Sequence, residues 1–294
     1  MLTVLVPGGS GQLGTDLAAL ANGDVKVTAM GSKDLDLTRT GDVIRVVTEF
    51  ADAAKDAGHR PVVINAGAYT AVDKAETEEE RAFAVNADGP RVLAAACSAR
   101  RVPLVHVSTD YVFPGDASRP YEVTDPIGPR SAYGRTKAAG EDAVLGSGAR
   151  AWIVRTGWVY GKTGHNFVRT MVRLEGERDT VSVVDDQRGA PTSSADLAAG
   201  LLELAGRIVE GEAPAGRVLH CTGAGETTWF GFARAIFEAI GADPERVKPC
   251  TSADFPSPVA RPAYSVLSNA SWAEAGLTPL RHWQEALAAY FQGS

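Results

Sequence analysis

The feature that most constrains this 294-residue chain is a glycine cluster placed directly after its first apolar run, residues 2–6. The glycines of the cluster are Gly8, Gly9, Gly11 and Gly14. Their G-x-G-x-x-G spacing, between a strand and a helix, is typical of a dinucleotide-binding turn; the alternative is a plain strand-to-helix turn. Such glycines allow a tight turn and let the main chain approach a pyrophosphate, and the helix N-terminus offers free N–H groups to the phosphates. The sequence therefore predicts a dinucleotide site here.

Short apolar runs alternate with helical stretches throughout the first half of the chain. Strands are predicted at residues 2–6, 25–30, 61–65, 102–108 and 151–157, and helices up to about residue 22, at 40–57, 78–100 and 132–146. Strands such as residues 62–65 and 104–108 are apolar at nearly every position, as expected when helices cover both faces of a sheet. We therefore expect right-handed crossovers and an α/β fold with a doubly wound parallel sheet of the Rossmann type.

The regular alternation ends near residue 158, after which proline and glycine become denser. This change predicts a dinucleotide-binding domain at residues 1–158 and a smaller mixed α/β domain, mostly for substrate, at 159–294. We expect the second domain to be discontinuous, with part of 186–215 returning to the first.

Composition excludes several classes of function. The net charge of −7 argues against nucleic-acid binding, and no apolar stretch is long enough to span a membrane, so no membrane partner is expected. No basic segment or apolar signal region precedes Leu2, so a cytoplasmic location is expected. The cysteines Cys97, Cys221 and Cys250 form no C-x-x-C unit and are expected to be reduced thiols, and the five histidines lack metal-ligand spacing.

The end of the second predicted strand bears on the cofactor. It reads Met30-Gly-Ser32-Lys33, without the carboxylate that usually holds the ribose hydroxyls of NAD. Ser32 and Lys33 suit a 2′-phosphate better, so NADPH is predicted, with NADH as the alternative. The predicted cofactor-binding residues are Gly8, Gly11, Gln12, Leu13, Asp36, Leu37, Asn65, Ala66 and Gly67, together with Tyr133 and Lys137.

A reactive group of side chains is predicted at the end of the fourth strand. Thr109 follows that strand, where open α/β sheets place ligands, and Tyr133 and Lys137 share one face of a later helix. A tyrosine titrates near 10, and a nearby ammonium is expected to lower its pKa and make it a better acid at neutral pH. The Y-x-x-x-K spacing alone is a weak signal, but combined with the glycine turn and Thr109 it is strong.

Several runs resemble a known enzyme family. GGSGQLG, NAGAYTAVDKAE, STDYVF and YGRTK resemble extended short-chain dehydrogenase/reductases that act on nucleotide sugars. The run Asp186–Thr192 (DQRGAPT), with Thr228-Trp229 and Arg261-Pro262, narrows the resemblance to the branch of dTDP-4-dehydrorhamnose reductases, over nearly the whole chain.

The resemblance implies a reduction by NADPH, or NADH, of the C4 ketone of dTDP-4-dehydro-L-rhamnose, giving dTDP-L-rhamnose. It implies that Tyr133 is the general acid, that Lys137 lowers its pKa and binds the nicotinamide ribose, and that Thr109 rather than Ser108 orients the ketone. Asn86 is expected beside the active site. The residues expected to bind the nucleotide sugar are Tyr69, Asp110, Tyr111, Trp158, Asn166, Phe167, Gln187, Arg188 and Arg261.

Some members of this family are dimers that hold Mg²⁺ through glutamates. Asp16 stands where one ligand would fall, but Ala195 stands at another, so Mg²⁺ is doubtful and no metal site is predicted. A monomer or a homodimer is expected. Two alternatives stay open: a reductase or epimerase of another nucleotide-linked 4-keto-6-deoxy sugar, and a non-catalytic regulatory subunit of the same fold. The acidic run at residues 76–80 is expected to be a solvated helix start.

Overall fold

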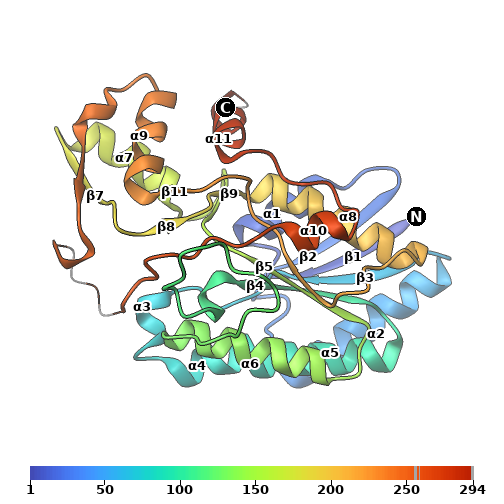
Figure 1. The fold of residues 1–294 in the computed structure, drawn as a ribbon. Coiled ribbons are helices and arrows are strands. Elements are labelled where there is room, and N and C mark those ends of the chain that lie inside the picture. The colour runs from blue at the N-terminus through green and yellow to red at the C-terminus, as the bar shows by residue number, and fades with distance from the viewer. Residues whose placement is uncertain (255–256, 258, 293–294) are drawn as a thin grey trace.

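The computed structural model describes residues 1–254, 257 and 259–292. In this part of the chain a six-stranded parallel sheet lies between two layers of helices, and a smaller lobe sits beyond one end of the sheet (Figure 1). The predicted doubly wound fold is confirmed.

The strands of the large sheet are β1 (Leu2–Pro7), β2 (Val25–Met30), β3 (Arg60–Asn65), β4 (Leu104–Thr109), β5 (Ala151–Thr156) and β10 (Val218–His220). Their order across the sheet is β10-β5-β4-β3-β1-β2, and every neighbouring pair is parallel. The chain leaves β1 toward β2 on one side and returns to β3 on the other. This reversal opens a crevice at the carboxyl ends of β1 and β3, where such sheets bind ligands.

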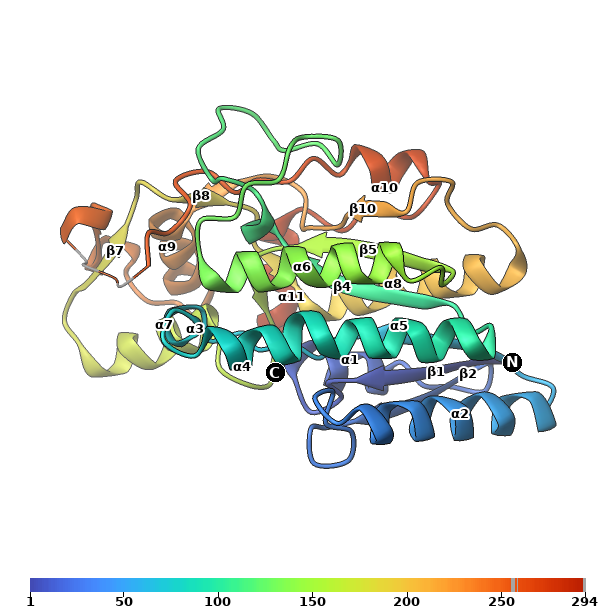
Figure 2. The same ribbon diagram turned by 90° about the horizontal axis from the view of Figure 1, so that it is seen from below.

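Alternating strand residues divide the core into two layers. Val4, Val62 and Ile64 face one layer of helices, which contains α1 (Gln12–Ala19), α8 (Ser194–Glu210) and α10 (Ala270–Glu274). Leu5 and Val63 face the other layer, which contains α2 (Thr40–Asp56), α5 (Gly89–Arg100) and α6 (Ala132–Gly146). Figure 2 shows α2, α5 and α6 side by side across this second face. Burial on both faces explains why these strands are apolar throughout.

More of the chain returns to the large sheet than the predicted 186–215 segment. Helix α8 packs its leucines against β1 and β3, the strand β10 adds a sixth strand beside β5, and Trp272 and Leu277 are buried in the same layer. β10 has only three residues, too few to show a strand period in the sequence.

The small lobe consists of α7 (Phe167–Glu177), β7 (Val181–Val184), α9 (Trp229–Ala239), β12 (Val247–Cys250) and α11 (Trp283–Gln292). Strands β7 and β12 pair in parallel, and Phe232, Ile236 and Phe237 of α9 are fully buried in its core. Two short pairings connect it to the large sheet: β6 (Val159–Tyr160) with β9 (Thr192–Ser193), and β8 (Arg188–Gly189) with β11 (Thr227–Thr228).

The predicted helix at 78–100 is not continuous. It is divided into α4 (Glu79–Phe83), a π-helical turn η1 (Ala84–Asp88) and α5, and it follows the short α3 (Val72–Ala75). The other short turns are η2 (Asp110–Val112), η3 (Pro244–Arg246) and η4 (Ser252–Asp254). The π turn places Asn86 against the loop after β3, as described below.

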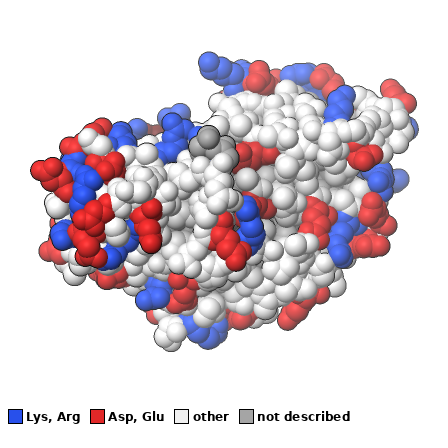
Figure 3. All heavy atoms as spheres, turned by 90° about the horizontal axis from the view of Figure 1, so that it is seen from above, with Lys and Arg blue, Asp and Glu red and all other residues white. Residues whose placement is uncertain are grey.

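The surface carries charges of both signs. Figure 3 shows lysines and arginines interspersed with acidic groups over the visible face. Among the described residues, the helices fall short of the length and apolar character needed to cross a bilayer.

Candidate active site

The glycine turn brings three main-chain segments into close contact. Gly8 has a φ of +83°, and a Cβ there would lie 2.5 Å from the Gly67 nitrogen. A Cβ on Gly14 would lie 2.4 Å from the carbonyl oxygen of Gly8, so this glycine lets α1 pack on the turn. Gly11 is different, because its Cβ would meet only the Gly8 oxygen, at 3.3 Å. Gly11 therefore leaves main chain open toward the cavity described next.

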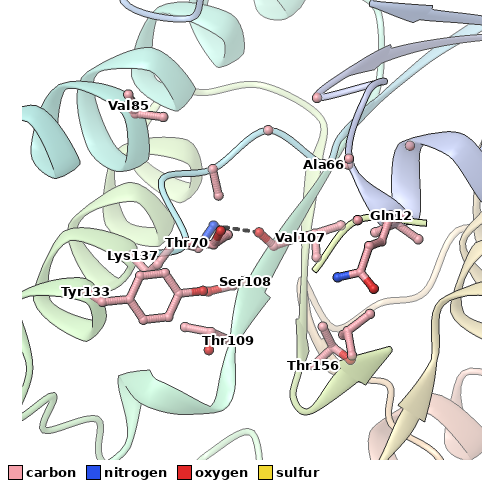
Figure 4. Close-up of a pocket in the computed structure, with 18 of the residues that line it drawn as sticks. Gln12, Ala66, Thr70, Val85, Val107, Ser108, Thr109, Tyr133, Lys137 and Thr156 are labelled. Carbon is pink, nitrogen blue, oxygen red and sulfur yellow. Dashed lines mark hydrogen bonds between the residues drawn. The ribbon is translucent and has the colours of Figure 1, made fainter. Parts of the chain in front are cut away.

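A cavity of about 840 Å³ lies at the carboxyl ends of β1, β3, β4 and β5. One part is lined by the glycine turn, the start of α1 and the end of β2; another is lined by Thr109, Tyr133 and Lys137 (Figure 4). The predicted residues that line it are Gly8, Gly11, Gln12, Leu13, Asp36, Leu37, Ala66, Gly67, Thr109, Asp110, Tyr111, Tyr133, Lys137 and Trp158. The predicted phosphate turn and the predicted reactive group thus share one cavity.

Helix α6 carries Tyr133 and Lys137, and its first turn is held from two sides. The hydroxyl of Ser131 accepts the N–H of Gly134 at 3.1 Å, which is an N-cap, and Glu76 accepts the N–H of Ala132 at 2.7 Å. Arg135 also forms a two-pronged ion pair with Glu79. The expected solvated helix start at residues 76–80 agrees with α4, which begins at Glu79, and with the exposure of Glu76 and Glu80. In addition, Glu76 and Glu79 anchor the helix that carries the reactive groups.

Tyr133 is partly buried beside Tyr111, with the two rings edge to face and their centroids 5.5 Å apart. Burial raises the pKa of the Tyr133 phenol, and its hydrogen bond with Thr109 only partly opposes this. This direction is opposite to the lowering expected from Lys137. The protein groups alone keep Tyr133 protonated, which is the form a general acid needs.

Lys137 is fully buried at the wall of the cavity. Its Nζ donates a hydrogen bond of 2.7 Å to the carbonyl of Val107 and lies 3.5 Å from Nε2 of His106 (Figure 4 shows the former). Burial lowers the pKa of Lys137 to about 8, against the opposing effect of the Glu141 carboxylate. The ammonium is directed to the strand, which explains why it does not lower the pKa of Tyr133 here.

Thr109 ends β4 and connects two candidate residues. Its hydroxyl donates to Asp110 at 2.9 Å and accepts the N–H of Tyr111 at 3.2 Å. Asp110 is buried, and its second carboxylate oxygen has no partner among the described residues. Burial raises the pKa of Asp110 to about 6, although hydrogen bonds from Ser265 and Thr109 oppose the shift. This oxygen is itself buried, against Gly157, although other atoms of Asp110 line the cavity.

An aromatic wall closes the side of the cavity that faces the small lobe. Trp158 follows β5, and its ring stacks on Trp229 at the start of α9, with centroids 3.5 Å apart. Both rings line the cavity.

Other predicted residues lie outside the cavity wall and hold the loop after β3 in place. Asn65 is fully buried and accepts the N–H of Gly67, so it shapes the loop rather than lining the cavity. Asn86, on the π turn, exchanges two hydrogen bonds with the main chain of Tyr69 and donates to Thr136 of α6. The Tyr69 hydroxyl donates to Glu78. These contacts fix the loop after β3 against α6.

The predicted nucleotide-end residues lie in or near the small lobe but not on the wall of the main cavity. Asn166 caps α7 and donates to Gln12, while Phe167 packs on Trp229 and Phe232. Gln187 donates to Ser252, and Arg188 pairs with Glu226.

Arg261 lies apart from this group. It forms a two-pronged ion pair with Asp73 and lines a smaller adjoining cavity of about 120 Å³, which shares Tyr111 with the main one.

The residues considered for Mg²⁺ have other partners. Asp16 accepts a hydrogen bond from the Ser194 hydroxyl, and Asp196 pairs with Arg281. Within residues 1–254, 257 and 259–292, no three His, Cys, Asp or Glu side chains are placed to hold a metal ion.

Several residues of the cavity wall are not evident from the sequence, among them Thr70, Thr156, His165 and Trp229. Thr156 ends β5, so the rule that found Thr109 could have found it. His165 and Trp229 come from loops and helix starts far along the chain, and their spacing gives no signal of where they lie.

Comparisons with known proteins agree with this geometry. A family model described as the RmlD substrate binding domain matches residues 2–294. The dTDP-4-dehydrorhamnose reductase of Streptomyces griseus is 50% identical over 98% of this chain and 92% of its own, and that of Mycobacterium tuberculosis strain H37Rv is 48% identical over 97% and 91%. A crystal structure of dTDP-4-dehydrorhamnose reductase from Bacillus anthracis in complex with NADP has a TM-score of 0.91 at 35% identity, covering 99% of both chains. The chain therefore belongs to the dTDP-4-dehydrorhamnose reductase family.

Proposed function

We propose that this chain catalyses the NADPH-dependent reduction of dTDP-4-dehydro-L-rhamnose to dTDP-L-rhamnose. The observation that carries the proposal is that Thr109, Tyr133 and Lys137 lie on the wall of the same cavity as the glycine turn. The family, with its close relatives of that activity, supports the choice of substrate.

The cavity fits a dinucleotide phosphate. Gly11 and the uncapped start of α1 leave main-chain N–H groups open toward it, and the end of β2 presents Ser32 without a carboxylate. NADPH, when bound, supplies the hydride that is added to C4 of the sugar. We expect Ser32 and Lys33 to lie near the 2′-phosphate and Asp36 and Leu37 to cover the adenine.

The protein's own groups handle the proton. Tyr133 holds its proton firmly and delivers it to O4 as negative charge develops on that oxygen, so ketone plus hydride plus proton gives the alcohol. Thr109 holds O4 beside Tyr133. Lys137, in its charged form, binds the nicotinamide ribose. Stabilising the phenolate left behind requires its ammonium to turn away from the Val107 carbonyl.

The aromatic wall and the small lobe bind the rest of the substrate in this proposal. Tyr111 and Trp158 contact the sugar, and Asp110 lies beside them on the cavity wall. Asn166, Phe167, Gln187, Arg188 and Arg261 are assigned to the nucleotide end, where arginines suit a diphosphate. Tyr69 is assigned to the substrate cleft beside the loop after β3. To bind the diphosphate, Arg261 must release the Asp73 carboxylate.

One observation favours a second candidate function. A relative that is 46% identical over 98% of this chain is named dTDP-4-keto-6-deoxy-D-glucose reductase, from Streptomyces niveus. Reduction of another nucleotide-linked 4-keto-6-deoxy sugar is therefore the alternative.

The testing experiment measures loss of reduced nicotinamide absorbance with a panel of dTDP-, GDP- and UDP-linked 4-keto-6-deoxy sugars. We expect the highest kcat/KM with dTDP-4-dehydro-L-rhamnose and NADPH. Turnover only with another sugar supports the alternative, and no turnover with any supports a non-catalytic subunit. We place the activity in the cytoplasm, consistent with three cysteines that form no disulfide, and propose a monomer or homodimer.

A further inference from the structure

His106, on β4, is a fully buried histidine in direct contact with the reactive lysine. Its Nδ1 lies 3.0 Å from the amide nitrogen of Asn65, and its Nε2 lies 3.5 Å from Nζ of Lys137. It therefore joins the loop after β3 to the reactive group.

The main chain decides which way the Asn65 amide points. The N–H of Gly67 donates to Oδ1 of Asn65 at 3.1 Å. Turning the amide over would place its NH₂ group against that N–H, two donors with no acceptor between them. The amide oxygen thus faces Gly67, and the amide NH₂ donates to Nδ1 of His106.

This hydrogen bond fixes the tautomer of His106. Burial and the neighbouring Lys137 hold the pKa of His106 well below its usual range, so the ring is neutral. Because Nδ1 accepts, the single ring proton sits on Nε2. That N–H points at Lys137. An ammonium cannot accept a hydrogen bond from this N–H, whereas a neutral amine can.

The other groups around Lys137 either favour its charged form or carry no charge. Glu141, one turn further along α6, favours the ammonium, but it is shared with Arg155 of β5 and Ser108 of β4. The Val107 carbonyl accepts from the ammonium, and Tyr133, one turn before, is protonated. His106 is thus the contact that disfavours the charged lysine through the direction of a hydrogen bond.

We propose that His106 is a positioning residue which Asn65 and Gly67 lock as the Nε2–H tautomer, so that it presents a donor to Lys137 and makes the lysine a readier proton donor. The expected effect on kcat rests on the proposed function, whereas the expected tautomer of His106 does not. The loop that borders the cofactor cavity thereby sets the acidity of a group on α6.

The structural test is ¹⁵N NMR of the histidine rings in the protein without substrate, with the His106 signals assigned by their loss in His106→Phe. A protonated ring nitrogen and a bare one have well-separated ¹⁵N shifts. We expect a neutral ring with its proton on Nε2 at about pH 7.5. A proton on Nδ1, or on both nitrogens, overturns the proposal. This readout does not depend on any enzymatic activity.

The kinetic test replaces Asn65 by aspartate, which accepts from both Gly67 and the ring and so forces the proton onto Nδ1. His106 then offers Lys137 a lone pair, which favours the ammonium. The alkaline decline of kcat, which follows loss of the Lys137 charge, should move up by about one pH unit or more in Asn65→Asp. The ¹⁵N shifts of this variant check that the tautomer has changed.

The added carboxylate could act through charge alone, so the shift is measured again in the His106→Phe background. We expect most of it to disappear there. An equal shift in both backgrounds, or no shift in Asn65→Asp once the tautomer has changed, overturns the proposal. If the parent enzyme turns over no sugar, the proposed function fails, while the NMR result still decides the tautomer.

Discussion

The ring of Trp158 lies face to face with that of Trp229, with centroids 3.5 Å apart and only 4° between the ring planes. The first ring belongs to the loop after β5 and the second to the first turn of α9, so the stack connects the large sheet to the small lobe at the cavity. Trp158 has a φ of +51°, a conformation that costs a non-glycine residue about 1–2 kcal/mol. Gly189 makes room for it, since a Cβ there would lie 2.2 Å from the Trp158 ring. We infer that the stack holds Trp158 in this conformation.

Trp229→Ala should therefore weaken substrate binding more than it slows the chemical step. An aromatic pair contributes about 0.5–1.5 kcal/mol beyond its buried area, so we expect KM for the nucleotide sugar to rise about 2–10-fold, with a smaller change in kcat. Trp229→Phe, which keeps a ring, is the matched control and should recover most of the affinity. Steady-state kinetics decide; an unchanged KM in Trp229→Ala would show that the stack has no part in binding.

Tyr133→Phe removes the proposed proton donor and leaves the ring. We expect kcat to fall about 100–10,000-fold, the usual contribution of a general acid, while the Kd for NADPH stays nearly the same. Tyr264→Phe, whose hydroxyl donates to Glu226 instead, is the control and should retain activity. Turnover of Tyr133→Phe at the parent rate would mean that another group supplies the proton.

Asp110→Asn should stabilise the fold in a pH-dependent way. The folded-state pKa of Asp110 is raised to about 6, above its unfolded value, so the native state binds this proton more tightly and loses stability as pH rises from about 4 through 6. The asparagine side chain carries no charge, so Asp110→Asn removes this loss of stability. We expect the free energy of unfolding to increase by up to about 3 kcal/mol near pH 7.5 and hardly at all near pH 4.

Denaturant unfolding at the two pH values measures this difference, with Asp142→Asn on the exposed face of α6 as the control. An equal effect of Asp110→Asn at both pH values would contradict a raised pKa.

Two glycines of the turn have different expected roles: Gly14 allows the helix to pack, and Gly11 leaves room for the phosphates. Gly14→Ala forces a Cβ into the main chain of the turn and should lower Tm sharply, because backbone cannot move aside as a flexible side chain can. Gly11→Ala meets one atom at 3.3 Å and should fold with a Tm near the parent's. Its Kd for NADPH should nevertheless rise at least tenfold, since the methyl group stands where the phosphates approach. Calorimetry measures the Tm, and fluorescence titration measures the Kd for NADPH. A normal NADPH affinity in Gly11→Ala would show that the phosphates bind elsewhere.

Ser32→Asp tests the cofactor assignment. A carboxylate at the end of β2 repels a 2′-phosphate and accepts hydrogen bonds from a ribose diol. We expect the ratio of kcat/KM for NADPH to that for NADH to fall at least tenfold. Ser10→Asp, on the glycine turn of the same cavity, controls for the added charge. An equal loss with both cofactors in Ser32→Asp would argue against a 2′-phosphate at this strand end.

Local chemistry was sufficient to predict the strands and the turn. Four of the five long strands are largely buried, the edge strand β2 alternates between partly buried and exposed residues along most of its length, and Gly8, Gly11 and Gly14 occupy positions where a side chain would obstruct the main chain or a phosphate. Residue type and spacing therefore carry the information. That Tyr133 and Lys137 share one face of α6 and line one cavity was also predictable, because four residues make about one helical turn. The short β10, by contrast, has no period of its own and is a strand only because it lies beside β5.

The sequence by itself determined which residues can donate a proton, bind a phosphate or fill a core, since these follow from side-chain chemistry and near-neighbour geometry. Only the tertiary structure decided that Trp229 lies on Trp158, that Glu76 holds the first turn of α6, and that the buried His106 faces Lys137 with one particular nitrogen. It also reversed the expected direction of the Tyr133 pKa. The physical reason is that pKa values and hydrogen-bond directions depend on burial and on partners from distant parts of the chain, which neither residue type nor spacing records.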